Sequence, residues 1–271
     1  MKKKRLIPVL LLRNGWLVQS KNFSEYKNLG NPITAVERLS QWASDELIYL
    51  DISPDDTYDL RRDDLNTPNR HSIFEILDDI SKRTFMPITV GGKIRTISDI
   101  FERLSRGADK VCINTQALED RSFITKAANQ FGSQCIVVSV DVKSIDGEYV
   151  VMRDGGKVQT PYLAEEWSHI VECCGAGEIL LNSVDRDGKK NGYEIPVLQS
   201  VSDLVKIPVI ACGGAGEWED FAEALKKTKV DAVAAANVFQ HVDQSVYLVK
   251  KYLFDHNYNV RPPNLLCINP I

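Results

Sequence analysis

The amino-acid sequence predicts an α/β fold in which eight parallel strands close into a barrel and each strand is followed by a helix. Short apolar runs alternate with amphipathic segments along the chain, and near-continuously apolar strands indicate a parallel sheet covered by helices. The alternation occurs eight times, which favours a closed (βα)8 TIM barrel over an open sheet. Because barrels of about 250 residues commonly form one domain, we expect a single domain over residues 1–271.

The expected strands are short apolar runs, and amphipathic stretches such as "PITAVERLSQWAS" and "SIFEILDDISKR" lie between them. The first run, within "RLIPVLLLRNG", begins at a charged residue, stays apolar to Leu12 and is followed by the turn signal Asn14-Gly15. The eight expected strands lie at 5–11, 46–51, 86–90, 110–113, 135–141, 178–183, 207–211 and 231–235.

An internal repeat predicts that the barrel is built from two similar half-barrels of four β–α units each. The segment "MPITVGGKI" (86–94) matches "IPVIACGGAG" (207–216), and "RLIPVLLLR" (5–13) matches "CIVVSVDVK" (135–143). In this alignment Leu11 lies opposite Asp141, so the first half lacks the carboxylate that the second half carries.

Two segments depart from the repeat. The polar stretch 53–70, "SPDDTYDLRRDDLNTPNR", is unusually long for a connection after a strand. In a barrel it would be an inserted loop on the C-terminal face, where active sites form, although a flexible surface excursion explains it equally well. We expect the tail 261–271, "RPPNLLCINPI", to extend along the outside of the barrel.

Composition excludes several classes of protein. The net charge of −4 gives no reason to expect nucleic acid as a partner, and no segment approaches the ~20 apolar residues of a membrane span. The start "MKKKRLIPVLLL" lacks the small-residue cleavage site of a secretory signal. Six cysteines without CxxC spacing indicate buried thiols, and four scattered histidines give a metal site little support. We therefore expect a cytoplasmic protein with no metal and no cofactor.

Glycine pairs end two of the expected strands, Gly91-Gly92 in the first half and Gly213-Gly214 in the second. Tight strand-to-helix turns let backbone N–H groups approach an anion at a helix N-terminus. Barrels often bind phosphate in the loops after the last two strands, where Gly213-Gly214 and Ala236-Asn237 fall. Glycine also simply makes turns, but its symmetric placement in both halves favours phosphate binding.

Two aspartates follow expected strands at the end where barrel enzymes place their active sites. Asp141 ends "IVVSVD", and Asp187 lies in "SVDRDGKKNGY" after the sixth strand. A helix cap or a turn is the alternative for both, and it is at least as good an explanation for Asp187, which precedes Gly188. For Asp141 the functional interpretation leads.

Four charged residues, Arg5, Glu46, Lys110 and Glu178, stand at the starts of strands one, two, four and six. They should meet at the amino-terminal end of the barrel. Two cations and two anions there can form an ion-pair ring that serves stability, or they can plug the entrance of a pore. The residues by themselves favour the stability interpretation over the pore entrance.

Several motifs together resemble the cyclase subunit of imidazole glycerol phosphate synthase over nearly the whole chain. These motifs are "DELIYLDI", "TVGGKI", "GADKVCINTQAL", "FGSQCIVVSVDVK", "GAGEILLNSVDRDGKKNGY" and "PVIACGGAGEWEDFAEAL". The resemblance implies a barrel that docks a glutaminase at its amino-terminal face. Ammonia from the glutaminase would pass through the barrel interior to a site at the carboxyl-terminal face.

The resemblance also assigns roles at the carboxyl-terminal face. The family's catalytic pair is an aspartate ending strand one and another ending strand five; the second matches Asp141 and the first falls on Leu11. General acid–base chemistry by two carboxylates is not available to one carboxylate and a leucine. Further departures from the family pattern are Gln19, Lys93, Asn182 and Cys212. The positions expected to bind phosphate or another ligand are Gly91, Gly92, Lys93, Asn114, Thr115, Asp187, Gly188, Gly213, Gly214, Ala236 and Asn237.

The amino-terminal face keeps the family pattern. Arg5, Glu46, Lys110 and Glu178 match the family's ammonia gate, and Asp109 matches a position at the glutaminase interface. An intact entrance with an altered exit resembles the cyclase-like paralogues associated with sugar amidation in bacterial surface-polysaccharide pathways. There the barrel and a glutaminase supply ammonia to an ATP-dependent N-acetyl sugar amidotransferase, which forms the acetamidino sugar.

Three hypotheses follow. The first is an ammonia-conducting subunit of a sugar amidotransferase system, with a glutaminase and the ATP-dependent enzyme as partners and a phosphate or sugar nucleotide as ligand. The second is a true cyclase of histidine biosynthesis whose acid has moved to another residue. The third is a barrel without enzymatic role that binds a phosphorylated or nucleotide ligand. Leu11 argues against the second, and the complete gate argues against the third.

Overall fold

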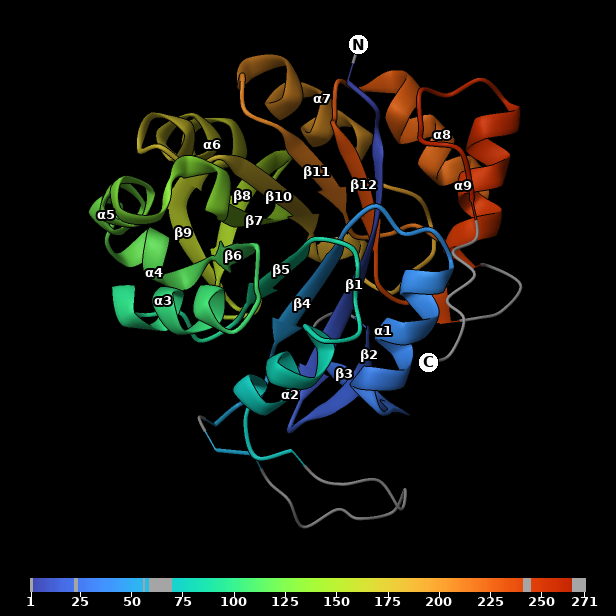
Figure 1. Ribbon diagram of the computed structural model, residues 1–271. Coiled ribbons are helices and arrows are strands. Elements are labelled where there is room, and N and C mark those ends of the chain that lie inside the picture. Colours follow the sequence, from blue (N-terminus) through green and yellow to red (C-terminus); the bar gives the residue numbers. More distant parts are fainter. Residues whose placement is uncertain (1, 22–23, 56, 59–69, 241–244, 265–271) are drawn as a thin grey trace.

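Eight parallel strands form a closed barrel, and helices surround it (Figure 1), so the predicted (βα)8 fold is confirmed. The computed structural model describes residues 2–21, 24–55, 57–58, 70–240 and 245–264. The barrel closes because β1 pairs in parallel with the last strand as well as with its neighbour in the first half. In barrel order the strands are β1 (Arg5–Arg13), β4 (Leu47–Asp51), β5 (Ile88–Gly91), β6 (Lys110–Ile113), β7 (Ile136–Ile145), β10 (Glu178–Ser183), β11 (Val209–Cys212) and β12 (Ala232–Ala235).

The outer layer consists of amphipathic helices, several of which begin at a side-chain cap. Asn31 caps α1, and Thr96 and Asp99 form a reciprocal capping box at α3, an arrangement that satisfies N–H groups with no partner inside the helix. Among the described residues no helix is long and apolar enough to span a membrane. The helices are α1 (Pro32–Gln41), α2 (Ile73–Ile80), α3 (Ile97–Ser105), α4 (Thr115–Glu119), α5 (Ser122–Phe131), α6 (Ala164–Cys173), α7 (Ile195–Leu204), α8 (Trp218–Lys227) and α9 (Val246–Asp255), with 3-10 turns at η1 (Ser133–Cys135), η2 (Val184–Arg186) and η3 (Val238–Gln240).

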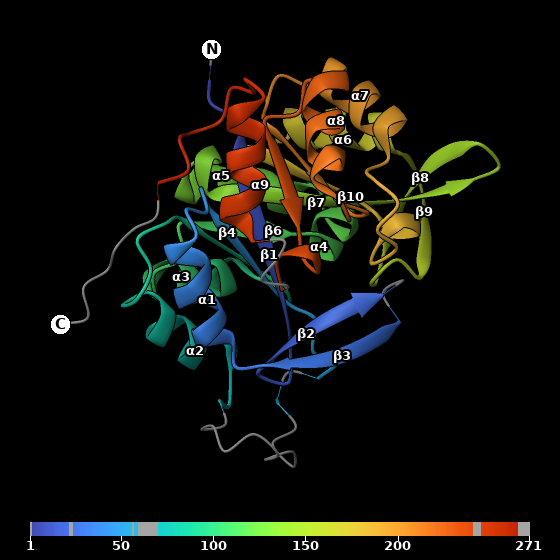
Figure 2. The ribbon, with the colours of Figure 1, turned by 90° about the vertical axis from the view of Figure 1, so that its right-hand side faces the viewer.

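Two β-hairpins extend from the barrel and were not expected from the sequence (Figure 2). The first joins β1 to β2 (Trp16–Lys21) and β3 (Glu25–Gly30); the second joins β7 to β8 (Glu148–Arg153) and β9 (Val158–Leu163). Both open with a two-residue turn of positive φ, at Asn14-Gly15 (51° and 77°) and at Asp146-Gly147 (51° and 86°). Such turns match the twist of paired strands. Strands expected to end at residues 11 and 141 therefore continue to Arg13 and Ile145.

The hairpins follow the first strand of each half-barrel, so they repeat the internal symmetry that the sequence predicts.

Alternate residues of β1 face opposite sides. Leu6, Leu10 and Leu12 belong to the layer between sheet and helices, while Ile7 and Val9 belong to a second apolar cluster inside the barrel. The barrel interior is also filled from other strands, by Ile48, Cys112, Val137, Leu180, Ile210, Ala232 and Ala234.

Gly92 lets β4 and β5 end side by side. Its φ is 98°, and a Cβ there would lie 2.1 Å from the backbone oxygen of Asp51. The Gly92 carbonyl also accepts a hydrogen bond of 2.8 Å from the buried Arg103 side chain. Any side chain at this position would separate the two strand ends, which together form part of the site described below.

We predict that Gly92→Ala lowers the free energy of unfolding by roughly 2–4 kcal/mol, because backbone strain and overlap with Asp51 add together. Gly30→Ala is a matched control, since its φ is 110° but nothing lies within 4 Å of the added Cβ. That control should lose only about 1 kcal/mol. Urea unfolding of both variants gives the comparison, and equal losses would contradict the steric explanation.

Candidate functional site

A cavity of about 670 Å³ lies at the carboxyl ends of the barrel strands, within the ~300–1,000 Å³ typical of small-ligand sites. We call it the main cavity. Its floor is formed by the barrel interior, and its walls come from the strand-to-helix loops and both hairpins. The residues that form its wall include Val9, Leu11, Ser20, Tyr26, Leu50, Asp51, Gly92, Lys93, Arg95, Asn114, Thr115, Ser139, Asp141, Asn182, Asp187, Cys212 and Ala236.

The structure brings most of the residues expected at this face together. Asp141 and Leu11 line the main cavity, as do Gly92, Lys93, Asn114, Thr115, Asp187 and Ala236. Gly91, Gly188, Gly213, Gly214 and Asn237 are not among its lining residues. Added side chains at Gly91 and Gly213 would collide with neighbouring strands, and the Asn237 amide donates to the Ser20 carbonyl at 2.7 Å. Gly91, Gly213 and Asn237 therefore support the cavity wall through packing and hydrogen bonding without lining the cavity.

Asp141 is the most chemically distinctive group in the main cavity. Its buried carboxylate accepts hydrogen bonds from the Asn114 amide at 2.7 Å and from the Asn182 amide and Ser139 hydroxyl at 3.2 Å each. Burial raises the pKa of Asp141 to about 6, although these three hydrogen bonds oppose the shift; nearby Asp187 adds to it. A carboxyl group with this pKa can both give and take a proton near neutral pH.

Leu11 provides no second acid–base group. It points inward from β1, packs against the apolar cluster of the barrel interior and lines the main cavity. Its neighbours in register are Leu50 on β4 and Val18 on β2. The geometry therefore places a hydrocarbon surface at the position where the resemblance led us to expect a second carboxylate.

Asp51 is a buried carboxylate in the cavity wall that the sequence interpretation missed. Asp51 is the last residue of β4. A carboxylate at the carboxyl end of a barrel strand is the signal that could have identified it. Its oxygens accept hydrogen bonds from the Ser53 amide at 3.0 Å, the Ser53 hydroxyl at 2.5 Å and the Tyr58 hydroxyl at 3.0 Å. With three donors already bound, Asp51 is suited to organising the wall.

Part of the expected 53–70 insertion folds against the main cavity. The Lys93 ammonium donates to the Asp55 carbonyl and lies 6.0 Å from the centre of the Tyr58 ring. Burial, together with the Asp51 carboxylate, raises the pKa of Tyr58, so its hydroxyl stays protonated as a donor. Lys93 has a φ of 54°, a left-handed conformation that favours glycine. Residues 56 and 59–69 of the insertion, and 265–271 of the expected tail, lie outside the described part of the chain.

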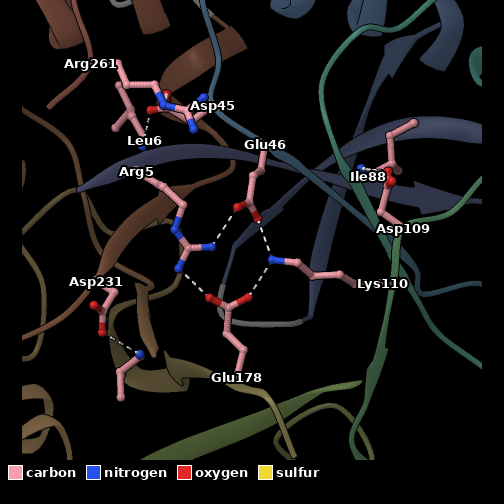
Figure 3. Close-up of polar contacts among 11 residues, drawn as sticks. Arg5, Leu6, Asp45, Glu46, Ile88, Asp109, Lys110, Glu178, Asp231 and Arg261 are labelled. Atoms are coloured by element: carbon pink, nitrogen blue, oxygen red, sulfur yellow. Dashed lines mark hydrogen bonds and ion pairs between the residues drawn. The ribbon is translucent and has the colours of Figure 1, made fainter. Parts of the chain in front are cut away.

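At the opposite end of the barrel, Arg5, Glu46, Lys110 and Glu178 alternate in a closed ring of ion pairs (Figure 3). Arg5 bonds to Glu46 at 2.7 Å and also to Glu178, while Lys110 bonds to Glu46 at 3.0 Å and Glu178 at 2.9 Å. Burial opposes charge on Glu46, but Arg5 and Lys110 outweigh it and hold the pKa of Glu46 below its usual value. Burial similarly opposes charge on Arg5, yet Glu178 and Glu46 raise the pKa of Arg5.

Asp109, expected at a glutaminase interface, has a structural contact of its own. Its carboxylate accepts a hydrogen bond of 2.8 Å from the backbone amide of Ile88 at the start of β5 (Figure 3). Asp45 accepts from the Leu6 amide at 2.9 Å, and Asp231 accepts from the Val209 amide at 3.3 Å. The same arrangement thus occurs at three places around this end: an aspartate just before one strand binds the backbone amide at the start of the neighbouring strand.

The cysteines depart in part from the expectation of buried thiols. Cys112 is buried and Cys173 is exposed, while Cys135, Cys174 and Cys212 are intermediate. Cys112 and Cys212 lie between the barrel interior and the main cavity. Cys173 is exposed because it ends α6 on the outer layer, next to His169 one turn earlier.

A family model described as "Histidine biosynthesis protein" matches residues 5–244. An imidazole glycerol phosphate synthase subunit HisF from Exiguobacterium sp. is 40% identical over 261 residues, covering 96% of this chain and 97% of the relative. The chain belongs to the HisF-like cyclase family. HisF subunits from Alkaliphilus metalliredigens and Dehalococcoides mccartyi are 39% identical over 259 residues and 40% identical over 264 residues. They cover 95% and 97% of the HisF-like chain, and 98% and 100% of their own lengths.

We predict that Asp141 makes the free energy of unfolding fall as pH rises from about 4 to 6. Its pKa is about 6 in the folded chain against an ordinary value of 3.8, so the folded state binds more protons in this window and ionisation destabilises it. The destabilisation reaches roughly 3 kcal/mol above pH 6 and is absent below pH 4.

Asp141→Asn removes this titration. Urea unfolding at pH 4 and pH 7 should therefore show the variant gaining roughly 3 kcal/mol relative to the original chain as pH rises. Asp255→Asn, at an exposed side chain that ends α9, is the control and should follow the original chain. If the Asp141→Asn difference does not change with pH, the carboxyl group does not carry the expected pKa.

Proposed function

We propose that this HisF-like barrel is the ammonia-conducting subunit of a glutamine amidotransferase. In this proposal a glutaminase docks at the amino-terminal face, and the ring of Arg5, Glu46, Lys110 and Glu178 guards the entrance. Ammonia crosses the apolar interior and enters the main cavity beside Asp141. The relatives named imidazole glycerol phosphate synthase subunit HisF support a place in such a complex.

The barrel interior suits neutral ammonia better than ammonium. Side chains between the ring and the main cavity include Ile7, Val9, Ile48, Val137 and Leu180. An ammonium ion would lose its hydration there without a compensating partner, whereas neutral ammonia has a much smaller desolvation cost. The same apolar path keeps water and protons from the two ends apart.

Leu11 is the observation that carries the proposal beyond ammonia transfer. Cyclisation of the family's usual substrate depends on two carboxylates, and the main cavity is lined by Asp141 and, at the other position, by a leucine. We propose that the ammonia acceptor is held instead by an ATP-dependent N-acetyl sugar amidotransferase at the carboxyl-terminal face. That enzyme would form an acetamidino sugar for surface-polysaccharide biosynthesis, with ATP activating the amide oxygen as a leaving group.

The second candidate is the cyclase subunit of histidine biosynthesis. It is favoured by the 39–40% identity to HisF subunits over nearly full length and by the position of Asp141. In that case another group must replace the missing aspartate. Asp51 is bound by Ser53 and Tyr58, and Asp187 accepts a hydrogen bond of 2.9 Å from the Ser20 hydroxyl. Both carboxylates are therefore already engaged in hydrogen bonds of the cavity wall.

We predict that the purified chain, supplied with excess ammonium salt, turns over the histidine-pathway substrate at least about 10²–10⁴-fold more slowly than a HisF subunit. The reason is the loss of one general acid–base group. Product formation in a steady-state assay is the measurement, with an HisF relative as the positive control. Comparable turnover by the two proteins would reject the sugar-amidation proposal and favour the cyclase.

Leu11→Asp tests whether that residue alone is responsible. We expect it to restore little cyclase activity, because Gln19, Lys93 and Asn182 also depart from the family pattern.

We predict that Lys110→Met uncouples glutamine hydrolysis from product formation. The substitution leaves Glu46 and Glu178 with Arg5 as their remaining ring partner, so the ring no longer closes. The ratio of glutamine hydrolysed to acetamidino sugar formed, in a system reconstituted from all three proteins, should rise severalfold. External ammonium should still support normal product formation, since it can enter at the carboxyl-terminal face.

The matched control is Lys126→Met, which removes a lysine from an exposed ion pair with Asp120. It should leave coupling unchanged. Circular dichroism and glutaminase binding verify that each variant is folded. Tight coupling in Lys110→Met, or equal loss of glutamine-dependent and ammonium-dependent product, would mean that the ring serves stability alone.

A further inference from the structure

A second cavity, of about 330 Å³, adjoins the main cavity at the carboxyl-terminal face. The two share Gly155 and Lys157, so they border on the same turn between β8 and β9. We call it the lysine cavity because three of its wall residues are lysines. Its wall consists of Ser24, Lys143, Gly155, Gly156, Lys157, Val184, Asp185 and Lys189.

The three lysines reach the lysine cavity from separate parts of the second half-barrel. Lys143 stands on β7 two residues beyond Asp141, so both side chains lie on the same face of that strand. Lys157 lies in the turn between β8 and β9, and Lys189 follows η2. Three separate elements thus bring positive charge to one hollow.

The lysine cavity has an excess of positive charge that its own wall does not neutralise. Within the described part of the chain, no ion pair or hydrogen bond involves the side chains of Lys143, Lys157 or Lys189, in contrast to Lys110 and Lys250. Asp185 is the single carboxylate among the wall residues. One of its oxygens already accepts the Ser144 amide at 2.8 Å.

The turn that carries Lys157 is held against the wall. Asp154, Gly155 and Gly156 have φ values of 53°, 67° and 74°. A Cβ at Gly156 would lie 2.8 Å from a methyl group of Val184, so the turn already packs closely on the segment after β10. This contact positions Lys157 at the boundary of the two cavities.

We propose that the lysine cavity is an anion subsite that binds a phosphate group of a small phosphorylated ligand, while the rest of that ligand lies in the main cavity. Lysine ammonium groups are flexible point charges that bind phosphate oxygens by charge-assisted hydrogen bonds. An anion would also relieve the repulsion among the three lysines. The subsite is distinct from the glycine turns expected to bind phosphate and does not depend on ammonia transfer.

The test uses inorganic pyrophosphate and orthophosphate as probes, with isothermal titration calorimetry at constant ionic strength. Lys143→Met/Lys157→Met should weaken pyrophosphate binding about a hundredfold, since two charge-assisted contacts are lost. Lys126→Met/Lys226→Met removes the same charge from helices α5 and α8 and should leave affinity nearly unchanged. Because all four lysines are partly or fully exposed, folding is not at risk.

A crystal structure with pyrophosphate locates the bound ion. Density between Lys143, Lys157 and Lys189 supports the subsite. Equal affinity of the two double variants overturns it, because overall charge alone would then explain binding. A phosphate bound beside Lys93 in the main cavity, with the lysine cavity empty, also overturns it.

Discussion

The ion-pair ring at the amino-terminal end is the interaction on which the rest of the barrel depends. Closing eight strands brings Arg5, Glu46, Lys110 and Glu178 to one place with little access to water. Each cation contacts both anions, so every charge is compensated twice, and removing one member leaves a buried charge short of a partner. Aspartates beside the ring, including Asp45 and Asp109, bind the amides that begin neighbouring strands. Paired charges and backbone hydrogen bonds therefore fix the strand starts at this end.

Along the barrel axis the chemistry changes in three steps, from paired charges to apolar side chains to a polar cavity. The inward series on β1 shows this within a single strand, because Arg5 is followed by Ile7, Val9 and Leu11. Leu11 extends the apolar step by one residue into the main cavity. Asp141 on the opposite half keeps its hydrogen-bonded carboxyl group. The apolar interior and the hydrogen-bonded carboxyl group of Asp141 therefore meet at the main cavity.

The eight barrel strands could be predicted because each is a short apolar run of the length typical of a strand. The two half-barrels could be predicted because these runs repeat along the sequence. The hairpins after β1 and β7 could not be separated from loops, since their outer strands, such as β3 with "EYKNLG", lack apolar alternation. Asn14-Gly15 and Asp146-Gly147 were the available signals. Asp141 was recognisable because it ends the apolar run "IVVSVD". The hydrogen bond between Asp51 and Tyr58 depends on tertiary folding, which no local pattern encodes. The same holds for the placement of Lys143 and Lys189 around one cavity.

The first hairpin is bonded to the opposite half of the barrel. Ser20 on β2 donates its hydroxyl to Asp187 after β10, and its carbonyl accepts the Asn237 amide after β12. One residue of the amino-terminal half therefore links the two half-barrels through hydrogen bonds. Because Asp187 also lines the main cavity, β2 is hydrogen-bonded directly to the cavity wall. A protein partner that bound the β2–β3 hairpin would therefore be able to change the shape of the main cavity without contacting its ligand.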